Sequence, residues 1–249
     1  LGAIIFSAFG APGTVVMIFP GIGTALWLLR EVKGVPGRQS ARGRLTPVPA
    51  VPVPIWALVG VILIMMSRNW TVISFEAFIP SWYKSLGYGA VFYGPLATTV
   101  VLASALGTVG SGRLADRYGR RGIILCTLLL TIPFILLFAQ FTGPSAFVTG
   151  AMIGLLAAST GPLTLVMAQE LMAGRAGLAS GLIMGLAFVT GAIGVPITGV
   201  VADALGMQTA FRLQVVVVIA TLFVVPLLPT EARLAELGRR RAELAAAAN

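Results

Sequence analysis

The sequence predicts an all-α membrane protein, and composition, hydropathy and periodicity support this prediction. Of the 249 residues, 57% are hydrophobic and 10% are charged, against about 25% charged residues in an average soluble domain. With a mean hydropathy of +0.97, the chain cannot supply the polar exterior that a soluble globule needs. The hydrophobic residues form long continuous runs instead of the alternating pattern of a membrane β-barrel, so we expect helices that cross a bilayer.

Seven hydrophobic runs are candidate membrane-crossing helices. The first run, residues 1–29, is interrupted by the turn signal Gly10-Ala-Pro-Gly13, so residues 1–9 are expected to end one helix and residues 13–29 to form the next. The remaining expected helices are residues 55–82, 91–111, 122–141, 145–169, 176–202 and 208–228. At about 1.5 Å per residue, each is long enough to cross a hydrocarbon core of about 30 Å.

The residue counts argue against several functions. The chain has no histidine, which is the commonest general base and metal ligand. Its single cysteine, Cys126, excludes an intrachain disulfide and a cysteine metal site. A net charge of +9 is compatible with nucleic-acid binding, but basic residues in a membrane protein gather in cytoplasmic loops. We therefore expect no enzyme, catalytic residue, metal, cofactor or nucleic-acid partner.

The basic residues predict the orientation of the chain. When the loops are assigned to alternating sides, one side collects fourteen of the 17 Lys and Arg residues, while the other holds Lys84 and Arg212. Arg68 lies inside a helix. Because cytoplasmic loops are rich in Lys and Arg, residues 30–54, the two short arginine loops and the C-terminal tail are predicted to be cytoplasmic.

The segment of residues 30–54 differs from the other loops. It is basic, and it ends in the proline-rich stretch Pro47-Val-Pro-Ala-Val-Pro-Val-Pro54, which favours an extended polyproline-like backbone. This composition is typical of a linker between two helical bundles. A basic segment that contacts phospholipids is the alternative.

One motif lies between the expected helices 91–111 and 122–141. It reads Gly112-Arg-Leu-Ala-Asp-Arg-Tyr-Gly-Arg-Arg121, and it resembles the cytoplasmic loop motif G-x-L-A-D-R-x-G-R-R of the major facilitator superfamily. Gly112 lets another helix approach closely, and the anionic Asp116 suits a neighbouring helix N-terminus. The alternative is a tight turn with basic anchors for lipid. The resemblance implies a cytoplasmic gate made by Gly112, Arg113, Asp116, Arg117, Gly119, Arg120 and Arg121.

The same resemblance implies the domain organisation. Members of the superfamily have two halves of six helices, and this motif lies between helices two and three and again between eight and nine. Residues 1–29 then end an N-terminal half (part of helix five, and helix six), residues 30–54 link the halves, residues 55–229 form the C-terminal six-helix bundle, and residues 230–249 form a cytoplasmic tail. The chain is thus expected to be a six-helix half with one preceding helix, separated from most of the N-terminal half. A rival assignment to helices one to six leaves the first run unexplained.

Two further stretches resemble the fosmidomycin resistance proteins, which are drug-efflux members of the superfamily. They are Phe78-Ile-Pro-Ser-Trp-Tyr83 with Ser85-Leu-Gly-Tyr-Gly89, and Met167-Ala-Gln-Glu-Leu-Met172 with Gly177-Leu-Ala-Ser-Gly181. This resemblance implies proton-coupled efflux of a drug or small organic anion by alternating access, in a bacterial inner (plasma) membrane. The expected partners are the substrate, protons, the lipid bilayer and the missing N-terminal half. The alternatives are an uptake or metabolite-exchange transporter of the same fold, and a scaffold subunit without transport.

Two charged residues lie within the expected helix 55–82. Arg68 is about 20 Å along the helix from Ile55 and hence near the midplane, and Glu76 follows about two turns later. Charges at this depth usually face a bundle interior or a wet cavity. The functional interpretation is that Arg68 binds substrate, with Asn69 and Trp70 beside it, and that Glu76 couples to protons. The alternative is that each charge pairs with a different neighbour for packing.

The charge distribution leads to a labelling prediction. In a Cys126→Ser background, Arg38→Cys should not react with a membrane-impermeant maleimide added to intact cells, whereas Lys84→Cys should react, because the two positions are predicted to lie on opposite sides. Labelling of position 38 from outside would contradict the predicted orientation.

Overall fold

The computed structural model describes residues 18–34 and 54–247, and these residues are almost entirely helical. Helix α2 (Ile18–Gly34) belongs to one compact unit of the chain, and the remaining elements belong to a second unit. The second unit contains α3 (Ile55–Ser85), α4 (Ala90–Tyr118), α5 (Arg120–Gln140), α6 (Ser145–Leu171), α7 (Ala176–Leu205), α8 (Met207–Leu222), the 3-10 turn η3 (Val225–Leu227) and α9 (Glu231–Ala247). The described parts contain no strand, which confirms the predicted all-α class.

Six helices of the second unit are long and apolar enough to cross a membrane. They are α3 to α7, and α8 continued through η3. Each corresponds to one expected run between residues 55 and 228. The tail of residues 230–249 contains a charged helix, α9.

Helix α2 differs from its prediction in its end point. It continues to Gly34, five residues into the segment expected to be a linker. The added residues include Glu31 and Lys33, which favour helix formation, and the next proline is Pro36, where a helix is disfavoured. The expected helix end at residues 1–9 and the proline-rich segment 35–53 lie outside the described residues.

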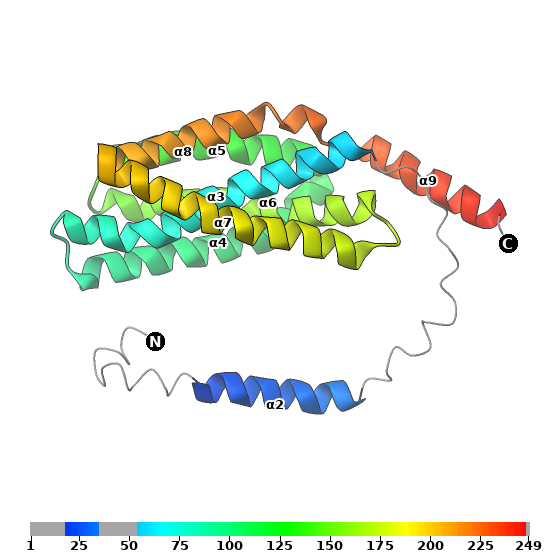
Figure 1. Cartoon of the computed structure of the whole chain (residues 1–249), viewed down its shortest axis with the longest axis horizontal. Helices are drawn as coiled ribbons and strands as arrows, with labels where there is room; N and C mark the ends of the chain where they lie inside the picture. Colours follow the sequence, from blue (N-terminus) through cyan, green and yellow to red (C-terminus); the bar gives the residue numbers. More distant parts are fainter. Residues whose placement is uncertain (1–17, 35–53, 248–249) are drawn as a thin grey trace. The chain divides into compact units, whose positions relative to one another are not determined.

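The six spans run antiparallel because the connections from α3 to α8 are only one to four residues long. Figure 1 shows α9 extending from one end of this bundle, beside the start of α3. The arginines of residues 113–121 and of α9 lie at that end, and Lys84 and Arg212 lie at the opposite end. Within this unit, the structure therefore places the arginines of the motif and of α9 at the end of the bundle opposite to Lys84 and Arg212.

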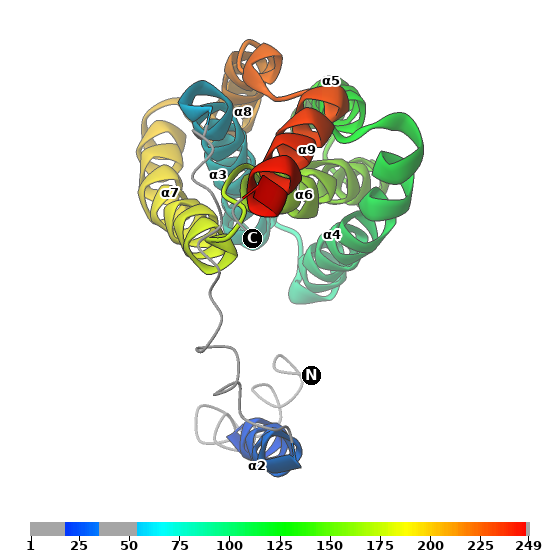
Figure 2. The ribbon, with the colours of Figure 1, turned by 90° about the vertical axis from the view of Figure 1, so that its right-hand side faces the viewer.

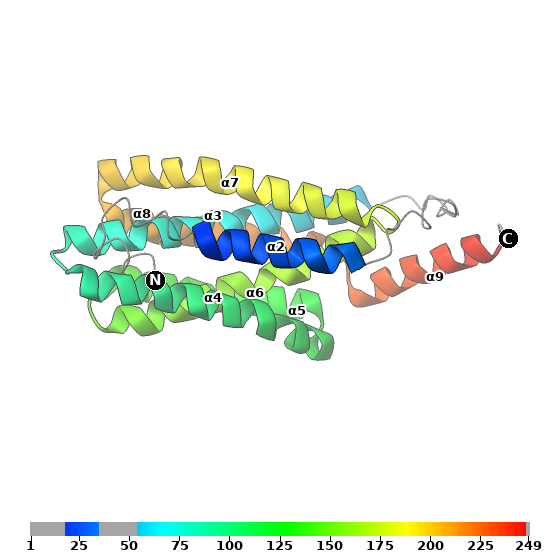
Figure 3. The same ribbon diagram turned by 90° about the horizontal axis from the view of Figure 1, so that it is seen from below.

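Helix α6 is the centre of the bundle. It contacts α3, α4, α5 and α7, and it is the most buried of the six spans. The view along the bundle shows α6 between α4 and α5 on one side and α3 on the other (Figure 2). A second view shows α4, α5 and α6 running side by side along the bundle (Figure 3).

Small residues let α4 and α6 approach closely. A Cβ atom added at Gly107 of α4 would overlap the backbone of Leu155 on α6, and one added at Gly154 would lie 2.5 Å from the carbonyl oxygen of Val100. Helices in lipid associate through such close packing, because lipid tails are as apolar as the side chains.

This packing predicts the effect of one methyl group. Gly107→Ala should lower the free energy of unfolding in detergent by about 1–3 kcal/mol, the usual cost of overpacking. Gly110→Ala is the matched control, because an added Cβ there meets nothing within 4 Å and both changes raise helix propensity equally. Equal melting temperatures for the two variants would contradict the close approach of α4 and α6.

Candidate functional site

Arg68 lies near the middle of α3 and is half-buried. Its Nε donates a hydrogen bond to the carbonyl oxygen of Ala157 at 3.1 Å, and one terminal nitrogen donates to that of Ala158 at 3.4 Å. Both acceptors belong to α6. These contacts favour the packing alternative for Arg68.

Asn69 and Trp70 point to a different helix. The Asn69 amide donates to the carbonyl oxygen of Ala187 on α7, and the Trp70 indole nitrogen donates to the Thr198 hydroxyl at 3.0 Å. Gly194 makes room for the indole, since a Cβ there would lie 2.5 Å from the Trp70 ring. Arg68, Asn69 and Trp70 therefore tie α3 to two neighbours and do not converge on one binding cavity.

A buried polar network joins α3, α7 and α8 and was not predicted from the sequence. The Gln214 amide donates to the Thr198 hydroxyl at 3.0 Å and accepts from Thr71 at 3.3 Å, while the Ser74 and Thr198 hydroxyls lie 3.2 Å apart. All four side chains are buried. The sequence feature that indicates such a network is Gln214, an uncharged polar residue within the apolar run 208–228.

Glu76 is exposed on α3, two turns beyond Arg68. Within the described chain, it makes no hydrogen bond or ion pair that would tie it to another helix. The other acidic residues of the six described spans, Asp116, Glu170 and Asp203, lie in the last turn of their helices. Glu76 is thus the one carboxylate of these spans that lies well inside a helix.

In the parts of the chain that the structure describes, no three His, Cys, Asp or Glu side chains lie close enough together to hold a metal ion.

The motif of residues 112–121 is mostly helical, which corrects its predicted loop. Helix α4 continues to Tyr118, and Gly119 alone separates it from α5. The motif includes the helix formers Arg113, Leu114 and Ala115, so the helix need not end at residue 111. It ends where Gly119 adopts a φ of +81°, which glycine reaches without strain.

The motif residues differ in whether they pair with another helix. Gly112 has open space beside it, Arg113 and Asp116 are exposed, and Arg121 is half-buried. The Arg117 guanidinium lies 5.4 Å from the Tyr118 ring. The described part of the chain gives Asp116 no hydrogen bond, so its expected position at a helix N-terminus stays a prediction.

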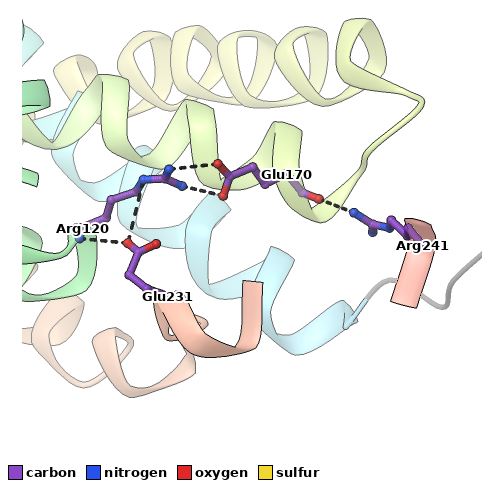
Figure 4. A network of polar contacts seen from close by, with 4 residues as sticks. All are labelled: Arg120, Glu170, Glu231 and Arg241. Carbon is purple, nitrogen blue, oxygen red and sulfur yellow. Dashed lines mark hydrogen bonds and ion pairs between the residues drawn. The ribbon is translucent and has the colours of Figure 1, made fainter. Parts of the chain in front are cut away.

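Arg120 is the paired member of the motif (Figure 4). Its two terminal nitrogens donate to the two carboxylate oxygens of Glu170, at 2.5 and 2.9 Å. This ion pair joins the N-terminus of α5 to the C-terminal end of α6. Because both atoms of the guanidinium fork are used, the contact fixes orientation as well as distance.

Helix α9 completes this network. The Glu231 carboxylate accepts a hydrogen bond from the backbone N–H of Arg120 at 3.1 Å, and Arg241 donates to the carbonyl oxygens of Glu170 and Leu171 at 2.6 and 2.9 Å. An acid thus sits at the N-terminus of α5 and a cation at the C-terminus of α6, as the helix dipoles favour. A cavity of about 620 Å³ lies between α9 and these helix ends.

Six apolar antiparallel spans with a charged network at one end define a polytopic helical membrane protein. Residues 59–247 match the family model described as Major Facilitator Superfamily. The match covers most of the chain, so the chain belongs to the major facilitator superfamily, a family of membrane transporters, as its sequence motif implied.

Two known proteins are similar to part of this chain. The chain is 44% identical over 108 residues to the uncharacterized MFS-type transporter YfnC of Bacillus subtilis (strain 168), across 43% of this chain and 26% of that protein. It is 34% identical over 113 residues to the fosmidomycin resistance protein of Escherichia coli (strain K12), across 45% of this chain and 28% of that protein. The alignments therefore span just over a quarter of each relative. They support the family resemblance seen in the sequence.

The Arg120 network predicts different effects for two neighbouring arginines. Arg120→Lys should lower the free energy of unfolding by about 1 kcal/mol, because lysine cannot reproduce the two-pronged contact with Glu170 and the pair is partly exposed. Arg121→Lys is the matched control, since no ion pair is found for Arg121 in the described residues. Thermal unfolding in detergent measures the difference, which should shrink at high salt. Equal stabilities at low salt would argue against a contribution from this ion pair.

Proposed function

We propose that this chain forms the C-terminal half of a proton-coupled efflux transporter for a drug or small organic anion. Membership of the superfamily and the likeness to the Escherichia coli fosmidomycin resistance protein support this proposal. The substrate pathway would lie between the bundle of α3 to α8 and a second bundle of six helices. Alternating access would then consist of the two bundles rocking about the substrate site.

The observation that carries the coupling part of the proposal is the position of Glu76. A carboxylate well inside a membrane span is by default a functional residue, and this one is exposed on the isolated bundle without an ion-pair partner in the described chain. Such a side chain is free to take up a proton from one side and release it to the other as access alternates. Arg68 lacks this freedom, because its guanidinium already binds α6.

We further propose that the motif of residues 112–121 is the gate at the α9 end, which would be cytoplasmic. Gly112, Arg113, Asp116, Arg117 and Arg121 have room for contacts with a second bundle. Gly119 and Arg120 would hold the motif in place through the turn and the Glu170 pair. In this proposal the first five residues close the pathway, whereas Gly119 and Arg120 keep the gate rigid.

The test is a pair of transport assays on the full-length transporter in proteoliposomes, with fosmidomycin as the probe. Glu76→Gln should abolish transport driven by a pH gradient and leave counterflow exchange near the unsubstituted level, because only the driven reaction needs a proton to be carried. Glu243→Gln is the control, as this exposed acid lies in α9, outside the six spans.

Gradient-driven transport by the Glu76→Gln variant would remove Glu76 from the coupling role. Transport of the probe only in the inward direction would replace efflux with uptake. A full-length protein that moves no probe in either assay would argue against fosmidomycin as a substrate.

A further inference from the structure

The middle of α6 contains a break in its backbone hydrogen bonding. Pro162 lies inside the helix and has no N–H, so the carbonyl oxygen four residues earlier, that of Ala158, lacks its helical partner. Ala158 is buried, where an unsatisfied carbonyl is costly. In a membrane span, such a group has to find a partner within the protein.

Arg68 supplies the missing donor from α3. One terminal nitrogen of its guanidinium donates to the carbonyl oxygen of Ala158, and its Nε donates to that of Ala157. A planar guanidinium can serve two neighbouring acceptors in this way with one side chain. The carbonyl end that the break creates also carries partial negative charge, which stabilises a cation.

Gly161 provides the room for this contact. A Cβ atom added there would lie 3.2 Å from the Arg68 Cζ and 3.3 Å from each terminal nitrogen, which is tighter than ordinary van der Waals contact. Gly161 and Pro162 therefore act together, because one opens the space and the other frees the carbonyl oxygen.

The space beside the guanidinium does not suit a substrate. The adjoining cavity, lined by residues such as Thr71, Thr131 and Thr160, has a volume of about 10 Å³, enough for about one water molecule. An organic anion does not fit there.

We propose that Arg68 is a positioning residue, whose guanidinium fills the break that Pro162 opens in α6 and so fixes α3 to α6. The two helices then move as one unit at this depth. Because α3 also carries Glu76, the contact sets where that carboxylate lies, a consequence that rests on the proposed function.

A double-mutant cycle tests the contact itself by thermal unfolding of the chain in detergent. Arg68→Met should lower the melting temperature, because the Ala158 carbonyl oxygen loses its donor, whereas that of Ala157 keeps the Thr160 hydroxyl. In Pro162→Ala the new N–H serves Ala158, so the double variant should melt above the additive expectation by about 4 °C or more. Additive effects of Arg68→Met and Pro162→Ala would overturn the proposal.

Two controls make the result specific. Pro133→Ala in α5 also restores an N–H, but the carbonyl oxygen that it serves belongs to the exposed Leu129, so it should be additive with Arg68→Met. Gly161→Ala should lower the melting temperature when Arg68 is present and do so less in the Arg68→Met variant, which tests the proposal even if Pro162→Ala does not fold. Gly185→Ala, which meets nothing within 4 Å, should show no dependence on residue 68.

Transport assays test the consequence for Glu76. In full-length protein, Arg68→Met should reduce gradient-driven transport of the probe, and adding Pro162→Ala should restore part of it. Loss without restoration would overturn the link to Glu76. If the unsubstituted protein shows no gradient-driven transport, the proposed function fails, while the unfolding cycle still decides whether Arg68 fills the break.

Discussion

The structure depends on one constraint, which is that polar backbone groups within the membrane spans need partners inside the protein. Regular helices meet this need along most of their length. At helix ends and at a proline, charged side chains supply the missing hydrogen-bond partners. At the helix ends beside α9, Glu231 serves the first N–H of α5, and Arg241 serves the last carbonyl oxygens of α6. In the middle of α6, Arg68 serves the carbonyl oxygens near Pro162. These three charged side chains thus complete the backbone hydrogen bonding, although composition alone assigns such residues to the surface or to a functional site.

The second requirement is that the spans associate with one another although the hydrophobic effect does not drive contact between helices in lipid. Two kinds of contact meet it on different sides of the bundle. Gly107 and Gly154 bring α4 and α6 into backbone contact, and Thr198 and Gln214 connect α7 and α8 to α3 through buried hydrogen bonds. Close packing and internal polar contacts are the usual means of association between helices in lipid.

The spans, their order and the charge separation were predictable from the sequence, because length and hydropathy alone determine which segments fit a bilayer. The gate motif was also visible, since it is contiguous. The helix ends were less predictable. The polar residues of segment 113–117 are typical of a loop, yet Arg113, Leu114 and Ala115 favour helix. Helix α4 therefore ends only at Gly119, whose φ is positive. The partners of side chains were hardest to predict, because they depend on how helices rotate about their axes. Arg68 near the midplane looked like a ligand for an anion, and only the geometry of α6 shows carbonyl acceptors beside it.

The single-residue turn at Gly119 makes the length of the motif as constrained as its composition. Since an α-helix turns by about 100° per residue, one residue inserted there would rotate Arg120 away from Glu170. It would also leave the Glu231 carboxylate without the backbone N–H from which it accepts a hydrogen bond. Substitutions at the exposed positions of the motif would leave this register intact. Natural variation at this turn should therefore include exchanges of residues but few insertions or deletions.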